Sequence, residues 1–556
     1  MDGPLKDVSK LSFYFVGIKG TGMAALAELL VRLGAQVRGS DTLDTFYTDE
    51  ILKTLGIPYV EGFREENLDP EVDYVVYSAA YHPDTHPELI RARRLGIPLF
   101  SYPEALGALS ATLPSAGVCG VHGKTTTTAL AGTLVKTAGL SGCVLVGSAV
   151  SNFGNRSTYF GGRDFFIAET CEYRRHFLHF HPRWIVLTSI EEDHLDYFRD
   201  YEDIQKAFVE YGLRLPDRGT LIFCADDPGA TEAAVQILRA RPDIWAIPYG
   251  TRAEGPYRIY DLQTVKGTTR FRLDGFPLAF EVHVPGEHTV LNAAAAVALV
   301  CTIREQLLQE AGEGGSCADA IEEDLVEGVA QFRGSKRRSE ILGEASGILV
   351  VDDYAHHPTA IRKTLSGFRS FYPHRRLVVD FMSHTYSRTK ALLEEFSRSF
   401  EAADSVILHK IYPSAREVND GSVSGHDLYK AVQRHHPEVY YFEEVMDALP
   451  FLKGYLREGD LFITLGAGDN FRLSHALYEA LKGTHPETQG VPAPPITEPQ
   501  FQPVPNRTHP ETRKALVSEP PSQGAEKDHA PAAQEAPRHT GAPQTPEDSS
   551  PPRSPA

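Results

Sequence analysis

Short apolar runs rich in β-branched and aromatic residues alternate with helical segments along the first 485 residues, and this alternation constrains the fold most strongly. Nine runs are predicted to be buried strands: LSFYFVGI, DYVVYSA, DFFIAE, RWIVLTSI, TLIFCA, GILVVDDY, RRLVVDF, DSVILHK and DLFITLGAG. Segments between them, such as MAALAELLVRLG and TTTALAGTLVKTAG, have the apolar spacing of helices. Strand–helix alternation predicts α/β units with parallel sheets. A β-rich stretch near residues 256 to 285 is the exception.

The chain is long enough for several such units. Its 556 residues are enough for roughly three or four domains. We place domain boundaries near residues 113 and 334. From Pro486 to Ala556 there are 17 prolines in 71 residues and a single aromatic, Phe501. Such a segment cannot bury enough apolar surface to offset its ordering entropy. We therefore expect 486–556 to be a disordered tail.

Composition excludes some classes of function. A net charge of −19 argues against a general nucleic-acid binder but leaves room for a local anion site. The six cysteines are scattered without a C-x-x-C pair, which favours a reduced compartment over a disulfide framework. The first residues lack the apolar core of a signal peptide, and no apolar run approaches the ~20 residues that span a bilayer. We expect a cytoplasmic protein with no membrane partner.

The segment Gly120–Thr126 (GVHGKTT) has the features of a phosphate-binding loop. It lies between an apolar run and a helical segment. Its glycines allow backbone N–H groups to turn toward an anion, Lys124 can reach terminal phosphates, and Thr125 offers a hydroxyl to magnesium. The start of the following helix carries the favourable end of its dipole. The spacing is shorter than the common G-x-x-x-x-G-K-[ST] pattern, because five residues separate Gly117 from Gly123.

Two acidic strand ends follow this loop in the sequence. The run DFFIAE ends on Glu169, and WIVLTSI leads into an acidic stretch that contains Glu191, Asp193 and His194. Acidic groups at strand ends beside a phosphate loop are where magnesium ligands belong. We expect Glu169 to be such a ligand, with His194 as a nitrogen ligand or a neighbouring polar group. Asp193 is explained by capping of a helix start.

Nine stretches occur in the order found in one enzyme family: GIKGTGMAALAELLVRLGAQVRGSD (17–41), GVHGKTTTT (120–128), AETCEYRRHFL (168–178), IEEDHLDYF (190–198), GEHTVLNAAAA (286–296), FRGSKRRSE (332–340), DDYAHHP (352–358), HTYSRT (384–389) and TLGAGD (464–469). Together they resemble the Mur ligases, cytoplasmic enzymes that build the peptide stem of bacterial cell-wall precursors. The resemblance extends from about residue 11 to 482 and leaves only the tail outside it.

The resemblance implies an α/β fold of three domains. These are a Rossmann-like UDP-binding domain (1–113), a central P-loop-type ATPase domain (114–333) and a C-terminal Rossmann-like domain that receives the amino acid (334–485). In the first domain, the residues implied to bind the UDP-linked substrate are Gly20, Thr21, Gly22, Met23, Asp41 and Ser78. The loop Gly17–Met23 has the spacing G-x-x-G-x-G, which differs from the dinucleotide fingerprint and argues against an NAD enzyme.

The other two domains are implied to bind ATP and the amino acid. Contacts to ATP are implied for Gly120, Val121, His122, Gly123, Lys124, Thr125, Thr126, Asn292 and Asp353, with Asn292 at the adenine and Asp353 at the ribose. Mg²⁺ is implied to lie among Thr125, Glu169 and His194. The amino acid is implied to meet His356, His384 and Arg388. The catalytic set is Lys124, Glu169, His194, His357 and Arg388.

The reaction implied is ligation of L-alanine to UDP-N-acetylmuramate at the expense of ATP, through an acyl phosphate. In such chemistry the protein positions the reactants and neutralises charge. His194, His356 and His357 are candidates for the general base by side-chain type, and the choice among them stays open. Serine and glycine are neighbouring choices of amino acid, and no oligomeric state is predicted.

The sequence departs from the family pattern at several positions. Val121 replaces a threonine in the phosphate loop, and Ser189 stands where asparagine is common before I-E. Thr289 replaces an asparagine, which leaves Asn292 as the amide for the base, and Lys19 replaces a glycine in the first-domain loop.

Two alternatives from different classes stay open. One is a sibling ligase that attaches recycled tripeptide in place of a single amino acid. The other is a non-catalytic nucleotide-binding relative. A guanine-nucleotide switch is disfavoured because the sequence contains no N-K-x-D segment.

Overall fold

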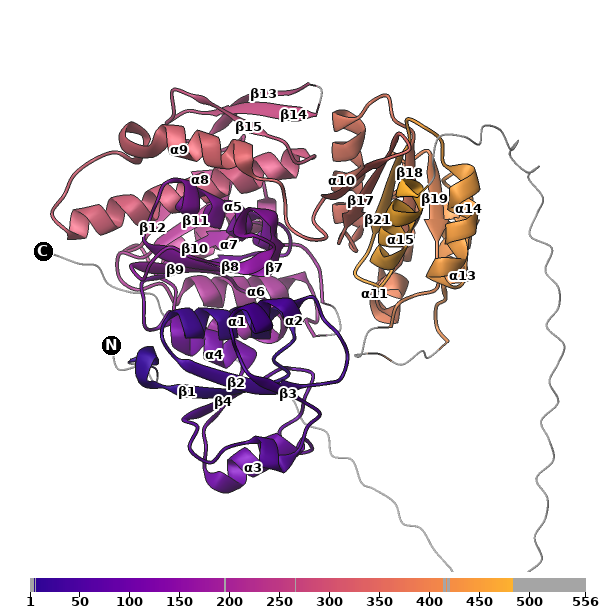
Figure 1. Cartoon of the computed structure of the whole chain (residues 1–556). Helices are drawn as coiled ribbons and strands as arrows, with labels where there is room; N and C mark the ends of the chain where they lie inside the picture. The colour runs from indigo at the N-terminus through magenta and orange to yellow at the C-terminus, as the bar shows by residue number, and fades with distance from the viewer. Residues whose placement is uncertain are drawn as a thin grey trace, which may run out of the picture. The chain divides into compact units, whose positions relative to one another are not determined.

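The computed structural model describes Leu5 and residues 7–194, 197–265, 267–413, 417 and 421–483. The predicted tail, 486–556, lies outside the described residues, as do Leu195 and Asp196 of the acidic stretch. Figure 1 shows the sheets and helices of the described part.

The first sheet has the strand order β3-β2-β1-β4-β5, and all its neighbours are parallel. Its strands are β1 (Ser12–Val16), β2 (Gln36–Asp41), β3 (Tyr59–Glu61), β4 (Tyr74–Tyr77) and β5 (Leu99–Ser101). Its helices are α1 (Thr21–Arg32), α2 (Thr48–Thr54), α3 (Pro87–Leu95) and α4 (Tyr102–Ser110). The chain adds β2 and β3 on one side of β1 and β4 and β5 on the other, so the strand order changes direction between β1 and β4. The loop after β1 therefore opens at the switch point where open sheets bind ligands.

The second sheet has the order β12-β11-β10-β6-β9-β7-β8, and only β8 runs antiparallel to its neighbour. Its strands are β6 (Ser115–Cys119), β7 (Gly142–Val150), β8 (Arg156–Phe160), β9 (Phe165–Glu169), β10 (Trp184–Leu187), β11 (Thr220–Cys224) and β12 (Trp245–Tyr249). Because β6 lies between β10 and β9, the loop after β6 is flanked by the ends of both. This arrangement places Glu169 and Ser189 beside the phosphate loop.

Helices α5 (Lys124–Thr137), α6 (Tyr201–Gly212), α7 (Pro228–Ala240), α8 (Glu287–Glu310) and α9 (Cys317–Gln331) accompany this sheet. An antiparallel sheet of β13 (Ile259–Val265), β14 (Thr268–Leu273) and β15 (Ala279–Val282) forms the predicted β-rich exception. Helices α5, α8 and α9 pack on one another (Figure 1). Helix α8 alone is long and apolar enough to cross a membrane among the described helices, but 78% of its most apolar window is buried inside the protein. It is thus buried as a core helix.

The third large sheet has the order β16-β17-β21-β18-β19-β20, with β16 antiparallel. Its strands are β16 (Glu340–Ala345), β17 (Ile348–Asp353), β18 (Leu377–Phe381), β19 (Ser405–Leu408), β20 (Val439–Tyr441) and β21 (Leu461–Leu465). Its helices are α10 (Pro358–Phe371), α11 (Tyr386–Ala391), α12 (Leu393–Ser397), α13 (Gly425–Gln433), α14 (Ala448–Tyr455) and α15 (Phe471–Lys482). Apolar clusters cover both faces of the sheet, since alternate residues of β17, β18 and β21 belong to two separate clusters.

Short 3-10 helices occupy some of the connections: η1 (Val8–Lys10), η2 (Glu65–Asn67), η3 (Ser151–Phe153), η4 (Tyr173–His179) and η5 (Val445–Asp447). All nine strands predicted from apolar runs are present, and each pairs in parallel with at least one neighbour. The prediction of a parallel α/β fold is therefore confirmed. The antiparallel pair β7 and β8 was not predicted, because the apolar run of β7 covers only residues 143–146 before Gly147 ends it.

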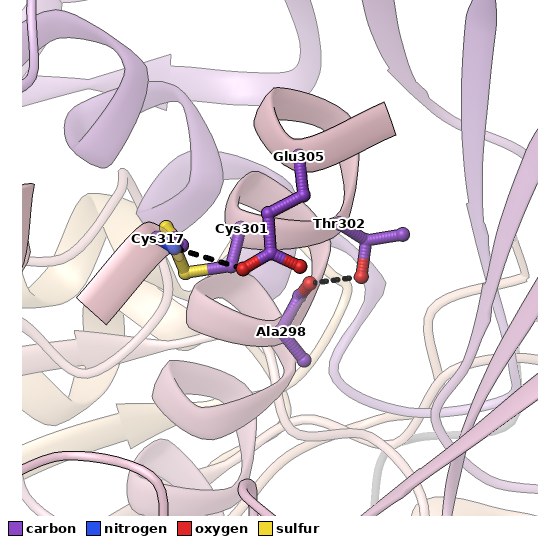
Figure 2. The surroundings of a disulfide bond; sticks show 5 residues. All are labelled: Ala298, Cys301, Thr302, Glu305 and Cys317. Atoms are coloured by element: carbon purple, nitrogen blue, oxygen red, sulfur yellow. Dashed lines mark hydrogen bonds between the residues drawn. A yellow bond between two sulfur atoms is a disulfide. The ribbon is translucent and has the colours of Figure 1, made fainter. Parts of the chain in front are cut away.

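The sequence favoured a reduced compartment over a disulfide framework and indicated no particular pairing, but one pair of cysteines is bonded. Cys301 on α8 and Cys317 at the start of α9 form a disulfide, with Cα atoms 5.3 Å apart (Figure 2). The backbone N–H of Cys317 donates to Glu305 of α8 at 2.8 Å, which fixes the start of α9 against that helix. The two cysteines are 16 residues apart, and only the turn between α8 and α9 brings them together. Cys119, Cys143, Cys171 and Cys224 are free.

Candidate active site

A cavity of about 420 Å³ is lined by residues from the second and third large sheets and from α8 and α10. This volume is within the range of small-molecule sites. Most of the residues predicted for ATP and the amino acid line it: Val121, His122, Gly123, Lys124, Thr125, Thr126, His194, Asn292, Asp353, His356, His357, His384 and Arg388. The structure thus brings together side chains that are up to 267 residues apart in sequence, from Val121 to Arg388.

The phosphate loop has a backbone that requires its two glycines. Gly120 has φ 132° and Gly123 has φ 84°, both in the region that side chains disfavour. A Cβ on Gly120 would collide with the hydroxyl of Thr188, and one on Gly123 would lie 2.5 Å from Asn292 Oδ1. Gly123 directly precedes α5, so the loop turns from β6 into the helix within four residues.

Lys124 is held at the mouth of this loop by oxygen atoms. Its Nζ donates to the carbonyl oxygens of Gly120 at 2.5 Å and Val121 at 3.2 Å, and it pairs with Glu172 at 3.0 Å. Burial opposes the charge on Lys124, but the neighbouring acidic groups, Glu172 foremost, together outweigh burial and raise the pKa of Lys124. Glu172 is only 1% exposed, and the same pairing lowers its pKa against the effect of burial. Lys124 therefore remains a cation at the cavity wall.

Ser189 holds the backbone of the loop from the end of β10. Its carbonyl accepts from Val121 N at 2.9 Å and its hydroxyl from His122 N at 3.0 Å. These two N–H groups are therefore already engaged. The N–H groups of Lys124, Thr125 and Thr126 belong to the first turn of α5, where a helix offers no internal partner. The donors available to a phosphate are thus those of the helix start.

Thr125 and Glu169 lie together behind the lysine. The Thr125 hydroxyl donates to Glu169 Oε1 at 3.0 Å, and Gly147 N donates to the other carboxylate oxygen at 3.0 Å. His194 lies on the neighbouring side, with Nε2 3.4 Å from Glu172 and its ring 4.8 Å from Tyr173. Of the three predicted magnesium ligands, two are in direct contact and the third contacts Glu172.

Arg388 and Asp193 form a buried ion pair across the cavity. Arg388 Nη2 donates to Asp193 Oδ1 at 2.5 Å, and the two side chains are 11% and 7% exposed. Burial opposes ionisation of Asp193, but Arg388 holds its pKa well below the usual value. The predicted role of Asp193 as a helix cap is wrong, since the next helix, α6, begins at Tyr201 and is capped by Asp200. Arg388 also donates to His384 Nδ1 at 3.3 Å.

The end of β17 and the loop before α10 also line the cavity. Asp353 accepts from Ser339 N at 2.6 Å and from Ala355 N at 2.8 Å, so backbone donors already occupy both of its oxygens. His356 Nδ1 lies 2.8 Å from the carbonyl of Tyr354 and must donate to it. That bond leaves a lone pair on Nε2. Burial and the nearby Arg388 cation lower the pKa of His356 well below its usual value, so it is neutral.

His122 and His357, which line the cavity, lie close to Glu191. His122 Nε2 lies 3.6 Å from Glu191 Oε1, and His357 Nδ1 lies 3.8 Å from Glu191 Oε2. Burial and the neighbouring His122 lower the pKa of His357 to about 4. Burial opposes ionisation of Glu191, but its contact with His122 lowers its pKa to about 2.

Asn292 faces the phosphate loop from the first turns of α8. Its Oδ1 accepts from Thr127 at 3.2 Å and packs against Gly123. Asn292 thus supports the loop in addition to lining the cavity, and its predicted contact with adenine stays a prediction.

The residues predicted for the UDP-linked substrate lie at the ends of three adjacent parallel strands. Gly20, Thr21 and Gly22 follow β1, Asp41 ends β2, and Ser78 follows β4. Asp41 accepts from Lys19 N at 2.5 Å and Thr42 N at 2.7 Å, and Ser78 Oγ accepts from Ala80 N at 3.3 Å. Met23 differs from the others, because its side chain is buried in the core at 3% exposure.

Lys19, which departs from the family's glycine, turns away from this edge. It is 1% exposed, and its Nζ donates to the carbonyls of Thr42 and Asp44 at 3.0 Å and to Glu61 at 2.9 Å. Asp49 lies 3.5 Å away. Burial opposes its charge, but these carboxylates outweigh burial and raise the pKa of Lys19. The substituted side chain therefore fastens the segment 42–49.

Sequence reasoning gave no site role to Glu172, Asp193 or Glu191, although each stands in a stretch that it singled out. Acidic side chains near Lys124, Arg388 and two histidines are the counter-charges that such a cluster needs. The need for counter-charges could have indicated that some of these acids belong to the site. Only the fold shows which acid pairs with which cation.

Three family profiles match the chain. They are described as "Mur ligase family, catalytic domain" over residues 12–113, "Mur ligase middle domain" over 118–300, and "Mur ligase, glutamate ligase domain" over 337–468. The UDP-N-acetylmuramate–L-alanine ligase of Treponema pallidum (strain Nichols) is 53% identical over 479 residues, which cover 86% of this chain and 98% of the relative.

Solved structures share the fold. The UDP-N-acetylmuramate-alanine ligase of Thermotoga maritima has a TM-score of 0.67 at 24% identity, covering 84% of this chain and 99% of that one. A murein peptide ligase from Psychrobacter arcticus has a TM-score of 0.57 at 22% identity, covering 85% and 99%. At 24% and 22% sequence identity, these structures show a shared fold and nothing more.

Proposed function

This chain belongs to the Mur ligase family, and from that premise we propose that it is an ATP-dependent ligase joining L-alanine to UDP-N-acetylmuramate in the synthesis of peptidoglycan precursors. The observation that carries the proposal is that Lys124, at the end of the phosphate loop, and Arg388 on α11 line the same cavity. A phosphate site and a cation for a carboxylate or phosphate are what such a ligation requires. The 53% identity to an enzyme of that name supports the choice of substrates.

In the first step, an oxygen of the lactyl carboxylate attacks the γ-phosphorus of ATP. The bond from that phosphorus to the bridging oxygen breaks, and ADP leaves with the electron pair. Lys124 and the N–H groups at the start of α5 stabilise the charge on the γ-phosphoryl oxygens. The product is an acyl phosphate.

In the second step, the amine of L-alanine attacks the acyl carbon. The nitrogen loses a proton, and the tetrahedral intermediate expels phosphate, which carries one oxygen of the original carboxylate. His356 is the proposed acceptor of that proton, because its Nδ1–H is held by the Tyr354 carbonyl, which leaves Nε2 as the nitrogen that can accept a proton. Arg388, His384 and His357 orient the amino acid and the reacting phosphate.

Thr125 and Glu169 fit a magnesium ion, with His194 as the third ligand. The Thr125 hydroxyl and a Glu169 carboxylate oxygen lie 3.0 Å apart beside the phosphate loop, and oxygen donors are those that Mg²⁺ prefers. When bound, Mg²⁺ supplies charge neutralisation at the phosphate oxygens. Asn292 and Asp353 are proposed to contact the adenine and the ribose of ATP.

We propose that Gly20, Thr21, Gly22, Asp41 and Ser78 hold the UDP group, with Met23 contributing through its backbone alone. The proposed domains are 1–113, 114–333 and 334–485. Location in the cytoplasm follows from the nucleotide substrates and is part of the proposal.

Phosphate release with ATP, Mg²⁺ and UDP-N-acetylmuramate, titrated against single amino acids and against intact tripeptide, tests the function. We expect release only when all substrates are present, with the highest kcat/KM for L-alanine over glycine and L-serine. Preference for the tripeptide would assign the sibling activity. Absence of release with every acceptor would indicate a non-catalytic relative.

A further inference from the structure

We propose that His122, Glu191 and His357 form a binding site for a divalent transition-metal ion of the Zn²⁺ class, separate from the magnesium site. The three residues come from the phosphate loop, the segment after β10 and the N-cap of α10. Their ligand atoms all lie within 4.8 Å of one another. Two imidazoles and one carboxylate are a donor set that binds such ions with an open position left for water or substrate.

The separations between these atoms favour an ion over direct hydrogen bonds. His122 Nε2 is 3.6 Å and His357 Nδ1 is 3.8 Å from the Glu191 carboxylate, both longer than a protein hydrogen bond. Two atoms that ligate one zinc ion at about 2.1 Å in tetrahedral geometry lie roughly 3.4 Å apart. The cluster therefore needs only a small contraction to close around an ion.

The ring nitrogens also lack other strong partners. His122 Nε2 is buried and has no hydrogen-bond partner among the described residues. The contact of His357 Nδ1 with Thr359 N is long, at 3.4 Å. His357 is 6% exposed, and its Nε2 is likewise buried without a hydrogen-bond partner in the described part of the chain. Buried polar atoms are normally satisfied, so this group of imidazoles is poised for a ligand.

The donor types distinguish this site from the magnesium site. In the magnesium site two oxygen donors, from Thr125 and Glu169, accompany the single nitrogen of His194, and oxygen donors suit a hard cation. The new site offers two nitrogens, which Mg²⁺ binds poorly and Zn²⁺ binds well. A bound ion connects the phosphate loop to the start of α10 and so ties two walls of the cavity together.

Zn²⁺ binding to the whole protein without nucleotide, measured by competition with a fluorescent chelator, tests this site. We expect one tight site in the wild type. His122→Ala, Glu191→Gln and His357→Ala each weaken it at least about 100-fold, since loss of a supporting second-shell partner alone costs 10- to 100-fold. Glu192→Gln, the exposed neighbour of Glu191, and Glu169→Gln in the magnesium site leave the affinity unchanged.

The melting temperature gives a second readout. Zn²⁺ raises it in the wild type and in the two control variants, because an ion that binds only the folded state stabilises that state. The three ligand variants lose this rise while keeping a cooperative transition. Equal Zn²⁺ affinity in the wild type and all three ligand variants, or no tight site in the wild type, would overturn the proposal. Neither readout depends on ligase activity, so failure of the proposed function leaves the test intact.

Discussion

Two glycine-rich loops with the same plan, strand then loop then helix, use their lysines in opposite ways. Lys124 follows β6, lines the cavity, and is bound by two carbonyls of its own loop and by one carboxylate, that of Glu172. Lys19 follows β1, is 1% exposed, and is bound by two carbonyls and two carboxylates of the segments 42–49 and 59–61. Lys124 thus lines the cavity, whereas Lys19 holds together loops of the first sheet.

The difference shows that a lysine in a glycine-rich loop is not by itself a phosphate ligand. What decides is the number of anions already on the ammonium and whether it faces a cavity. Glu172 keeps Lys124 charged and in place, and in the proposed function an incoming phosphate shares this cation. The acceptors around Lys19 are protein groups fixed by the fold, so its ammonium has no position left for a ligand.

The largest effect is expected for Lys124→Met. Loss of the cation at the γ-phosphate is expected to lower kcat by about 100- to 1,000-fold, which is the range for removal of one preorganised donor. Because the buried Glu172 loses its lysine partner and keeps only the 3.4 Å contact with His194, the variant is also less stable. The double variant Lys124→Met/Glu172→Gln recovers stability without activity, whereas Lys136→Met on the same helix keeps both. Normal turnover in the double variant would contradict the role of Lys124.

Lys19→Met tests the other loop. Removing one member of a buried ion pair costs about 3 kcal/mol or more in the free energy of unfolding, measured by denaturant titration. We expect KM for ATP to stay unchanged and KM for UDP-N-acetylmuramate to rise. Lys53→Met, an exposed lysine on α2, serves as the control. A stability equal to that of the wild type would show that the Lys19 contacts contribute nothing.

Asp193→Asn tests whether the third sheet is held in its working position by the buried pair with Arg388. Truncating one partner of such a pair costs about 2 kcal/mol, which predicts a roughly 30-fold loss of kcat/KM for L-alanine. Stopped assays with varied L-alanine measure this loss, and Glu192→Gln is the exposed matched control. An unchanged kcat/KM in Asp193→Asn would mean that the pair does not position Arg388.

The smallest effect concerns pH. Burial lowers the pKa of both His288 and His357 to about 4, below the value near 6.5 in an unfolded chain. Between pH 6.5 and 4 the unfolded state binds more protons, so the free energy of unfolding falls as the pH falls. The slope is at most about 1.4 kcal/mol per pH unit for each histidine. His288→Gln should reduce this slope in denaturant titrations at pH 5, 6 and 7, and an unchanged slope would contradict burial as the cause.

Much of the fold follows from the sequence, because apolar runs such as those of β17 and β21 and the glycine turn before α5 are local signals. The partners of the charges are not local. Asp193 and Arg388 are 195 residues apart and meet only because β10 and β18 end at the same cavity. The contacts of Lys19 and the disulfide Cys301–Cys317 could not be predicted either, because they depend on which segments the fold brings together.

Oxygen transfer tests the central claim, ligation through an acyl phosphate at the Lys124 loop, most directly. UDP-N-acetylmuramate labelled with ¹⁸O in both carboxylate oxygens is incubated with ATP, Mg²⁺, L-alanine and the protein, and the released phosphate is analysed by mass spectrometry. The account predicts one ¹⁸O atom in each phosphate and one in the amide product, with no transfer in the Lys124→Met/Glu172→Gln variant. Unlabelled phosphate released during amide formation would contradict it.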